Sequence, residues 1–226
     1  MNKKAIRVKS EVEFDQLCDR IDLEASHAVH HWSLWKGLHA SREDYYLEMN
    51  VSNTFWHLTL IAHRDAVLSH LCRLYDKHGG ALSLSRFLLT VKANRAFFCD
   101  AAFRQRLKDN PHVDTLAKNR AIDDSELDKE LASVSDSDPL VPKLWDLRDK
   151  VISHTDADRV RRNAPKTWLP PEDMETLLGR AGAITSKYSL FYKASLYGGI
   201  VGADDYTSTL RLLRKALSDS QHEIDK

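Results

Sequence analysis

The residues of this chain best suited to chemistry stand in one stretch, LWDLRDKVISHTDADRVRRN, which covers positions 144–163. It contains Arg148 and His154, six positions apart. A histidine titrates near neutral pH and can move protons. An arginine is a permanently charged fork that suits phosphate. Such a pair could cleave RNA without a metal: the histidine would take a proton from a 2′-hydroxyl or return one to the leaving oxygen, while the arginine stabilised the phosphate.

The spacing of the two side chains limits how they can cooperate. At about 100° per residue, positions six apart on an α-helix point about 120° away from each other. Two arrangements would bring Arg148 and His154 to one substrate. The helix could end near His154, where the HTDAD segment offers side chains that compete for backbone hydrogen bonds, or two copies of the helix could meet across a symmetric dimer. The spacing by itself favours an ordinary helix end, where both residue types interact well with the helix dipole.

A leucine stripe is expected to position this pair. Leu140, Leu144, Leu147 and Val151 recur at helical spacing and predict one buried face. His154 follows Val151 by three positions, so it should lie at the margin of that face. The SDSDPLVP segment before the stripe predicts a loop that leads into the helix.

The rest of the chain has the pattern of an all-α protein. Only eight glycines and six prolines interrupt long segments of helical periodicity. A first long helix should begin at Ser10, because Glu13 follows it in a capping-box pattern. A second should begin at Ser52 or Asn53 and stop at Gly79 and Gly80. Its apolar residues occupy nearly the whole circumference, which predicts a central, buried helix. We expect one all-helical domain over residues 1–226, a bundle of about six to eight helices.

The composition excludes several classes of protein. Charged residues make up 29% of the 226 residues, and no apolar stretch is long enough to span a membrane. The basic N-terminus lacks the apolar segment of a signal peptide. The three cysteines form no CxxC pair, which fits a reducing compartment. Lysine plus arginine equals aspartate plus glutamate, 33 each, so no large basic field exists for nucleic acid. We therefore expect a cytoplasmic protein with no membrane association.

Several stretches together resemble a known family. The segment RDKVISH matches the pattern of the HEPN superfamily, an arginine followed after four to six residues by a histidine. LWDLRDKVISHTDAD and the upstream NTFWHLTLIAHRDAVLSHLCRLYDKHGGALSLSRFL resemble the branch named after the abortive-infection AbiU proteins. The resemblance covers about residues 40–200. The upstream helix with LYDKH and SLSRFL makes it considerably more specific than the arginine and histidine alone.

The resemblance implies an architecture and an activity. It implies an all-α, up-and-down HEPN-like bundle that dimerises through the motif helices. Many family members are metal-independent endoribonucleases, often toxins or antiphage effectors. By position, Arg148 and His154 would be the catalytic residues of a composite site shared by both subunits, and Asp149 would be the polar neighbour that orients them. No cofactor or metal is implied. The expected partners are a second copy of the chain, an RNA substrate and an antitoxin or other regulator.

Basic residues near the motif could contact an RNA backbone and make its binding salt-dependent. They are Lys150, Arg159, Arg161 and Arg162. A solvated surface explains them equally well. The resemblance also leaves a second function open, since some HEPN proteins bind RNA or nucleotides, or serve as scaffolds for a protein partner, without cleaving anything. A third hypothesis is a helical dimer with a structural role alone.

Three further sets of residues outside the motif carry structural expectations. His27 and His31 stand at i and i+4 with Glu24 one turn earlier, a spacing that can hold a metal, although a polar helix face is the favoured interpretation. His63 and His70 alternate with leucines and are expected as core or interface histidines. Asp65 lies within the apolar pattern of the second long helix, where burial would demand a partner, so we expect a structural ion pair or a supporting role near the motif.

Overall fold

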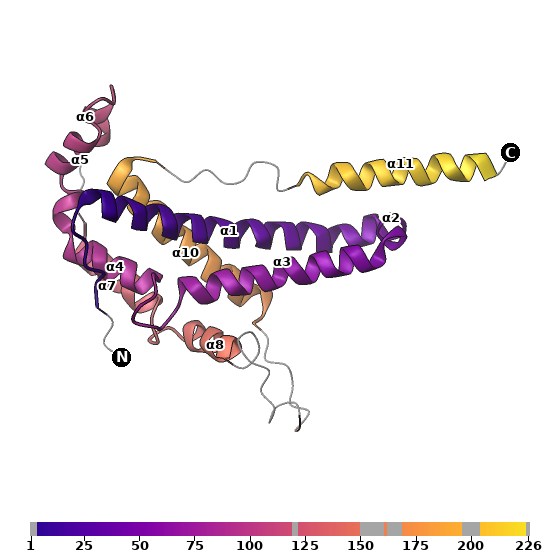
Figure 1. Cartoon of the computed structure of the whole chain (residues 1–226), viewed down its shortest axis with the longest axis horizontal. Coiled ribbons are helices and arrows are strands. Elements are labelled where there is room, and N and C mark those ends of the chain that lie inside the picture. Colours follow the sequence, from indigo (N-terminus) through magenta and orange to yellow (C-terminus); the bar gives the residue numbers. More distant parts are fainter. Residues whose placement is uncertain (1–3, 119–121, 150–160, 162–168, 196–203, 225–226) are drawn as a thin grey trace. The chain divides into compact units, whose positions relative to one another are not determined.

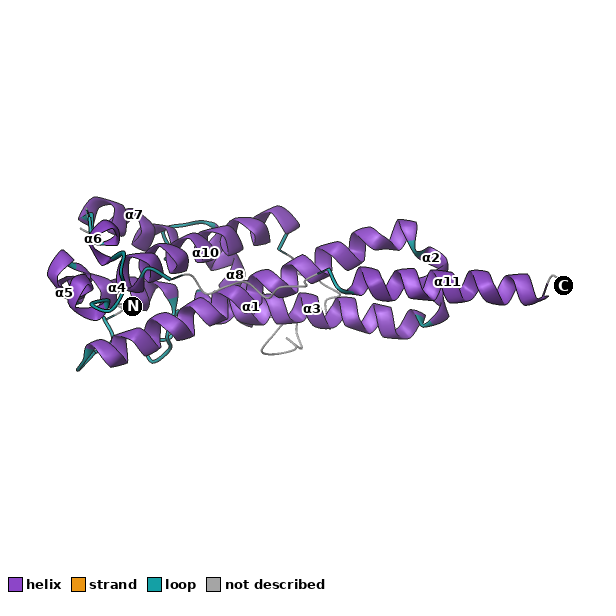
Figure 2. Cartoon of the chain, turned by 90° about the horizontal axis from the view of Figure 1, so that it is seen from above, coloured by secondary structure: helices purple, strands orange, loops and turns teal. Residues whose placement is uncertain are grey.

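Every regular element in the described part of the chain is a helix. The computed structural model describes residues 4–118, 122–149, 161, 169–195 and 204–224. These ranges contain ten α-helices and one 3₁₀ helix, and no strand (Figures 1 and 2). The all-α prediction is confirmed. The helices beyond the predicted six to eight are short, such as the four-residue α6 (Val113–Leu116), because a single turn leaves little periodic signal in a sequence.

The residues group into two compact units. Unit 1 comprises residues 1–26 and 69–198, and unit 2 comprises residues 27–68 and 199–226. Helices α1 (Glu11–Asp44) and α3 (Asn53–Leu74) form a hairpin, and each has residues in both units. The division therefore does not by itself separate two domains, and a single domain over residues 1–226 stays a prediction.

Unit 1 contains most of the shorter described helices together with α10. After the first half of α1 come α4 (Leu84–Ala93), η1 (Arg95–Phe98), α5 (Asp100–Arg106), α6, α7 (Asp124–Ser133), α8 (Leu140–Leu147) and α10 (Pro171–Lys193). Its core is aromatic: Phe14 lies 5.0 to 6.2 Å, between ring centroids, from Phe87, Phe98 and Tyr192. Ser189 of α10 donates a hydrogen bond of 2.5 Å to the buried carboxylate of Asp22 in α1. Apolar packing and this buried polar pair hold α10 against α1.

Unit 2 is a helical hairpin with one further helix packed on it. The second half of α1 and the first half of α3 lie side by side, joined by α2 (Tyr46–Val51) (Figures 1 and 2). The C-terminal helix α11 (Tyr206–Ile224) packs against α2. Leu38, Met49, Trp56 and Leu210 form the buried cluster between these elements. Leu210 is the residue through which α11 enters this core.

The start of α1 matches the predicted cap. The backbone N–H of Glu13 donates to the hydroxyl of Ser10 at 3.2 Å, and the carboxylate of Glu13 accepts from the N–H of Lys9 at 2.8 Å. Two N–H groups at the helix start are thus satisfied by neighbouring side chains, as in a capping box. In a standard capping box the carboxylate of Glu13 would accept from the N–H of Ser10. Here it accepts from the N–H of Lys9, one residue earlier.

The prediction that α3 is a central, buried helix was wrong in part. Val67, Leu71 and Leu74 in its second half are fully buried, but Phe55 and Leu58 in its first half are 60% and 57% exposed. The helix also ends at Leu74, before the predicted glycine stop. An apolar circumference shows that a helix could be buried all round, and the number of neighbouring helices decides whether it is. In unit 2 the neighbours of α3 leave one side of it uncovered.

None of the helices in the described ranges combines the length and the apolar character that crossing a membrane requires.

Candidate functional site

The helix that leads into the motif is held by its apolar face. In α8, Val141, Leu144 and Leu147 are buried. Asp138 lies just before this helix, and its carboxylate accepts from the N–H of Leu140 at 2.9 Å. Of the predicted stripe, Leu144 and Leu147 are buried, Leu140 is only partly buried, and Val151 lies outside the described residues. The helix places Arg148 directly after the last buried leucine.

The backbone changes its geometry at the arginine of the motif. Arg148 and Asp149 are in π-helical geometry, whereas the preceding residues are α-helical. Such widened turns within helices are rare and are frequent at functional sites. The 120° separation expected between Arg148 and His154 assumed a regular α-helix, and that assumption already fails at Arg148.

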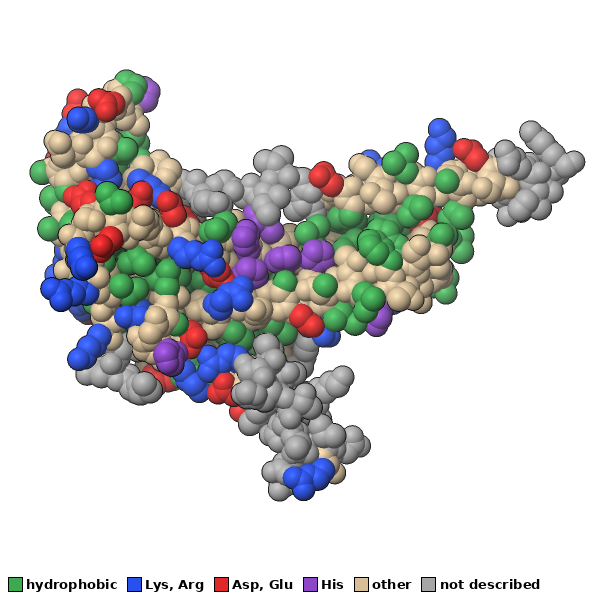
Figure 3. Space-filling model, in the orientation of Figure 1, with side chains coloured by type: hydrophobic (Ala, Val, Ile, Leu, Met, Phe, Trp, Pro, Cys, Tyr) green, Lys and Arg blue, Asp and Glu red, His purple; other side chains and the backbone are tan. Residues whose placement is uncertain are grey.

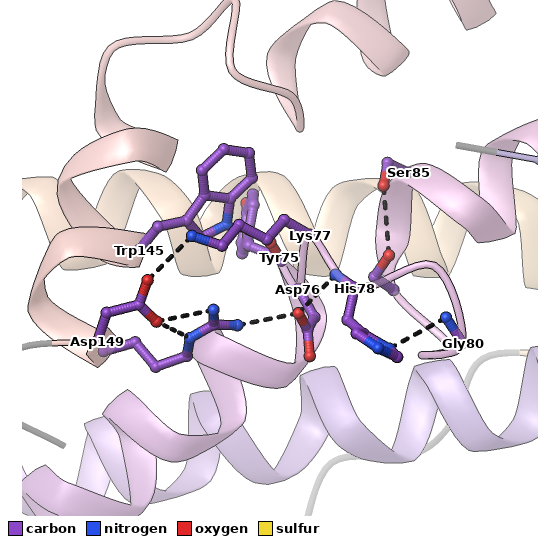
Figure 4. Close-up of polar contacts among 10 residues, drawn as sticks. Tyr75, Asp76, Lys77, His78, Gly80, Ser85, Trp145 and Asp149 are labelled. Carbon is purple, nitrogen blue, oxygen red and sulfur yellow. Dashed lines mark hydrogen bonds and ion pairs between the residues drawn. The ribbon is translucent and has the colours of Figure 1, made fainter. Parts of the chain in front are cut away.

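The guanidinium of Arg148 is anchored to the segment that follows α3. Its Nη1 lies 2.9 Å from Oδ1 of Asp76, and its Nε and Nη2 both lie 2.8 Å from Oδ1 of Asp149 (Figure 4). The arginine side chain is 19% exposed. A guanidinium carries five N–H groups, so donors remain on Nη1 and Nη2 after these contacts. Arg148 is thus held in place and keeps donors that could meet a phosphate.

Two further contacts tie the same segment to α8. Lys77 donates to Oδ2 of Asp149 at 2.9 Å, and its ammonium lies 5.5 Å from the ring centroid of Trp145 (Figure 4). The indole N–H of Trp145 donates to the backbone carbonyl of Tyr75 at 2.6 Å. The LYDKH segment, residues 74–78, therefore packs on the beginning of the motif. The sequence analysis used this segment for the family resemblance but did not predict that Asp76 and Lys77 would contact Arg148 and Asp149.

The charges of this cluster stabilise one another. Burial disfavours the charged form of Arg148, but hydrogen bonds to Asp149 and Asp76 outweigh it and raise the pKa of the arginine. The hydrogen bond from Lys77, assisted by that from Arg148, lowers the pKa of Asp149. The cluster pairs two cations with two carboxylates. A phosphate must therefore share Arg148 with Asp76 and Asp149, or displace one of them.

The other predicted site residues are distributed as follows. Asp149 contacts Arg148, and its orienting role in a catalytic site stays a prediction. Arg161 is helical and exposed. The remaining predictions, His154 as a catalytic residue and Lys150, Arg159 and Arg162 as RNA-binding residues, lie outside the described residues. Of the predicted site residues, the structure thus shows Arg148 and Asp149 in contact with each other.

A histidine pair lies in unit 2, across α1 and α3. Nδ1 of His31 is 2.8 Å from Nδ1 of His63, which requires one of the two nitrogens to be unprotonated. Burial lowers the pKa of His63 because it disfavours the charged imidazolium. The partner of His31 is thus on another helix. No group of three or more histidine, cysteine or carboxylate side chains suited to a metal occurs in the described ranges.

A cluster that the sequence analysis missed lies in unit 1, where Glu24 of α1 faces the end of α3. Its carboxylate lies 2.8 Å from Nδ1 of His70, accepts a hydrogen bond from Nε of Arg73, and lies 3.4 Å from Nη2 of Arg20. Burial opposes ionisation, but the hydrogen bonds from His70 and Arg73 prevail and lower the pKa of Glu24 to about 2. No sequence signal indicated that Glu24 would meet His70 and Arg73, because charged residues at helical spacing are common on solvated faces and these contacts join two helices.

The expected burial of Asp65 was wrong. Its side chain is 58% exposed, and its ion pair, at 2.9 Å, is with the adjacent Arg64. The face of α3 that carries Asp65 also carries the exposed Ala62, so it is a solvated face. This contact gives no support to the expected role of Asp65 near the motif.

Comparison with known proteins identifies a family whose model covers most of the chain. The family model HEPN_AbiU2, described as AbiU2, matches residues 11–215. The match includes both long helices, the LYDKH segment, the whole motif and the first half of α11. No curated protein and no solved structure matches the chain.

Proposed function

The chain belongs to the HEPN_AbiU2 family, and we propose that it is a metal-independent endoribonuclease of the toxin or antiphage type that works as a homodimer in the cytoplasm. The observation that carries the proposal is the anchoring of Arg148, half-buried at the end of a packed helix with N–H donors to spare. A pre-positioned guanidinium can stabilise the charge that develops on a phosphate during cleavage.

The proposed reaction is a transesterification. The 2′-oxygen of a ribose forms a bond to the adjacent phosphorus, and the bond from phosphorus to the 5′-oxygen breaks. One copy of His154 accepts the proton of the 2′-hydroxyl, and the second copy in the dimer donates a proton to the departing 5′-oxygen. The products are a 2′,3′-cyclic phosphate and a 5′-hydroxyl. In this scheme Arg148 holds the phosphate, Asp149 and Asp76 hold Arg148, and Lys150, Arg159, Arg161 and Arg162 contact the flanking RNA backbone.

The test is cleavage of labelled tRNA and mRNA in the presence of EDTA. Wild-type protein should cut, and His154→Ala and Arg148→Ala should not. The matched controls are His112→Ala, at an exposed position in unit 1, and Arg211→Gln, at an exposed position in unit 2, which should cut normally. Cleavage that survives in His154→Ala, or products that end in a 3′-hydroxyl, would refute the proposed site.

A specific observation favours a second candidate function. Both carboxylates beside Arg148 neutralise it, which suits a structural arginine as well as a catalytic one. On this alternative the protein is a catalytically silent HEPN module that binds RNA, a nucleotide or a protein partner such as an antitoxin. Such a module should bind without cutting, and its overexpression should leave growth unchanged. A free ribonuclease should slow growth, and His154→Ala should relieve the effect.

A further inference from the structure

A small pocket opens where the end of α1, α2 and the start of α3 meet in unit 2. Its volume is about 60 Å³. Met49 and Leu60 provide apolar walls, and Tyr46 stands at its edge. The other lining side chains are hydrogen-bond donors of several kinds: Arg42, Asn50, Asn53, Trp56 and His57. Apolar walls with a few convergent polar groups are the usual make-up of a ligand site.

One of the side chains that line the pocket is the buried Trp56. It is only 7% exposed, and its indole N–H is buried without a hydrogen-bond partner among the described residues. An indole N–H can only donate, and buried donors in native proteins nearly always have an acceptor. The ring is also held in place, since it belongs to the core cluster with Leu38, Met49 and Leu210. Because Trp56 lines the pocket, a ligand bound there is a candidate source of the acceptor.

The charge of the pocket selects the kind of acceptor. Arg42 is exposed, and no ion pair or hydrogen bond of its side chain occurs within the described residues. No carboxylate is among the residues that line the pocket in the described structure. The nearby Glu48 is buried and is paired elsewhere, with Nε of Arg214 at 2.5 Å. The first turn of α3, which starts at Asn53, contains no acidic residue, and the positive end of a helix dipole favours an anion.

The volume of the pocket limits the size of the ligand. One water needs about 10 to 15 Å³ of such volume, so the pocket has room for a group of a few heavy atoms. Tyr46 and Phe55, 66% and 60% exposed, offer aromatic surface outside it. Hydrophobic side chains gather over this end of the α1–α3 hairpin (Figure 3). An organic substituent on the bound group would find apolar surface there.

We propose that this pocket binds the phosphate group of a small phosphorylated ligand, with Arg42 supplying the counter-charge and the indole N–H of Trp56 donating to a phosphate oxygen. The site is separate from the Arg148 cluster, which lies in unit 1, and the proposal does not depend on ribonuclease activity. Free inorganic phosphate and an aromatic phosphomonoester share the chemistry that the pocket recognises.

The test is a titration of the full chain followed by the indole N–H resonances of its five tryptophans. Inorganic phosphate and phenyl phosphate are added at constant ionic strength, with chloride as the reference anion. Loss of one peak in Trp56→Phe identifies the resonance. Should that variant fail to fold, the four other Trp→Phe variants identify it by elimination. We expect the Trp56 resonance alone to shift and to saturate, with phenyl phosphate binding more tightly than inorganic phosphate if the aromatic surface contributes.

Arg42→Gln and Arg211→Gln form a matched pair of exposed arginines in unit 2. Removing the charge of Arg42 should weaken phosphate binding at least about tenfold, since the charge-assisted contact is lost. Arg211→Gln should leave binding unchanged. The proposal is overturned if no resonance shifts selectively, if chloride produces the same shift, or if Arg42→Gln binds phosphate as the wild type does. Equal affinity for the two phosphates would assign the site to free phosphate.

Discussion

The guanidinium of Arg148 lies 2.9 Å from the carboxylate of Asp76, although 72 residues separate them along the chain. Asp76 also accepts from the backbone N–H of His78 at 2.8 Å, which keeps the carboxylate within its turn. The turn after α3 and the end of α8 are thus joined at the first residue of the motif. This connection fixes where the guanidinium of Arg148 lies.

Asp76→Asn should weaken that connection. The amide keeps the shape of the side chain and an acceptor oxygen but loses the charge, so the charge-assisted bond to Arg148 becomes a weaker, neutral one. We expect about 1 to 2 kcal/mol less stability, because both partners are partly buried, and RNA cleavage reduced about tenfold through poorer positioning of Arg148. Urea denaturation and cleavage assays measure the two effects. Asp114→Asn is the control, since Asp114 pairs with Arg104 at the surface with 86% of its side chain exposed. Full cleavage by Asp76→Asn would remove Asp76 from the site.

The Glu24 cluster should make stability depend on pH in acid. The pKa of Glu24 falls from 4.5 to about 2 on folding. A carboxyl group whose pKa is lowered stabilises the fold above its unfolded pKa, and this contribution disappears as the pH falls through the folded pKa. Between about pH 4.5 and pH 2 the free energy of unfolding of the wild type should therefore fall by about 3 kcal/mol. Glu24→Gln lacks this contribution at every pH. Denaturant midpoints of both proteins at pH 7, 4 and 2.5 measure this. A difference in stability between the two proteins that stays constant over this pH range would contradict the lowered pKa of Glu24.

Trp145→Phe should remove one hydrogen bond and little else. The phenyl ring still packs beside Lys77, but the 2.6 Å bond from the indole N–H to the carbonyl of Tyr75 is lost. We expect a loss of about 1 kcal/mol in the free energy of unfolding. Trp35→Phe is the comparison, because Trp35 stacks on Trp32 and no hydrogen bond of its indole occurs in the described structure. Equal losses for both variants would show that ring size, not the hydrogen bond, matters at position 145.

Gly37→Ala tests how α11 is seated in unit 2. A Cβ at position 37 would overlap the hydroxyl and ring of Tyr206 at the start of α11, so that side chain must move. Gly182 in α10 has open space around the same position. Gly182→Ala should raise stability by about 0.5 to 1 kcal/mol through helix propensity. Gly37→Ala should forfeit this gain and lower the melting temperature. If both variants were stabilised equally, the contact between Tyr206 and α1 would not persist in solution.

The sequence by itself determined the features that depend on neighbours a few positions apart. The scarcity of glycine and proline and the apolar periodicity predicted the helices. The cap at Ser10 and the buried stripe of Leu144 and Leu147 followed from spacings of three and four residues, which one helical turn brings together. The family match also rests on such local segments.

Only the tertiary structure decided which helix faces meet. The contacts of Arg148 with Asp76, of His31 with His63 and of Glu24 with His70 span 72, 32 and 46 positions. Each depends on the rotation and packing of two helices, and a periodic pattern leaves both undetermined. The exposure of Phe55 and Asp65 on a helix predicted to be buried has the same cause. Periodicity shows which side of a helix is apolar, and burial requires a neighbour that only the folded chain supplies.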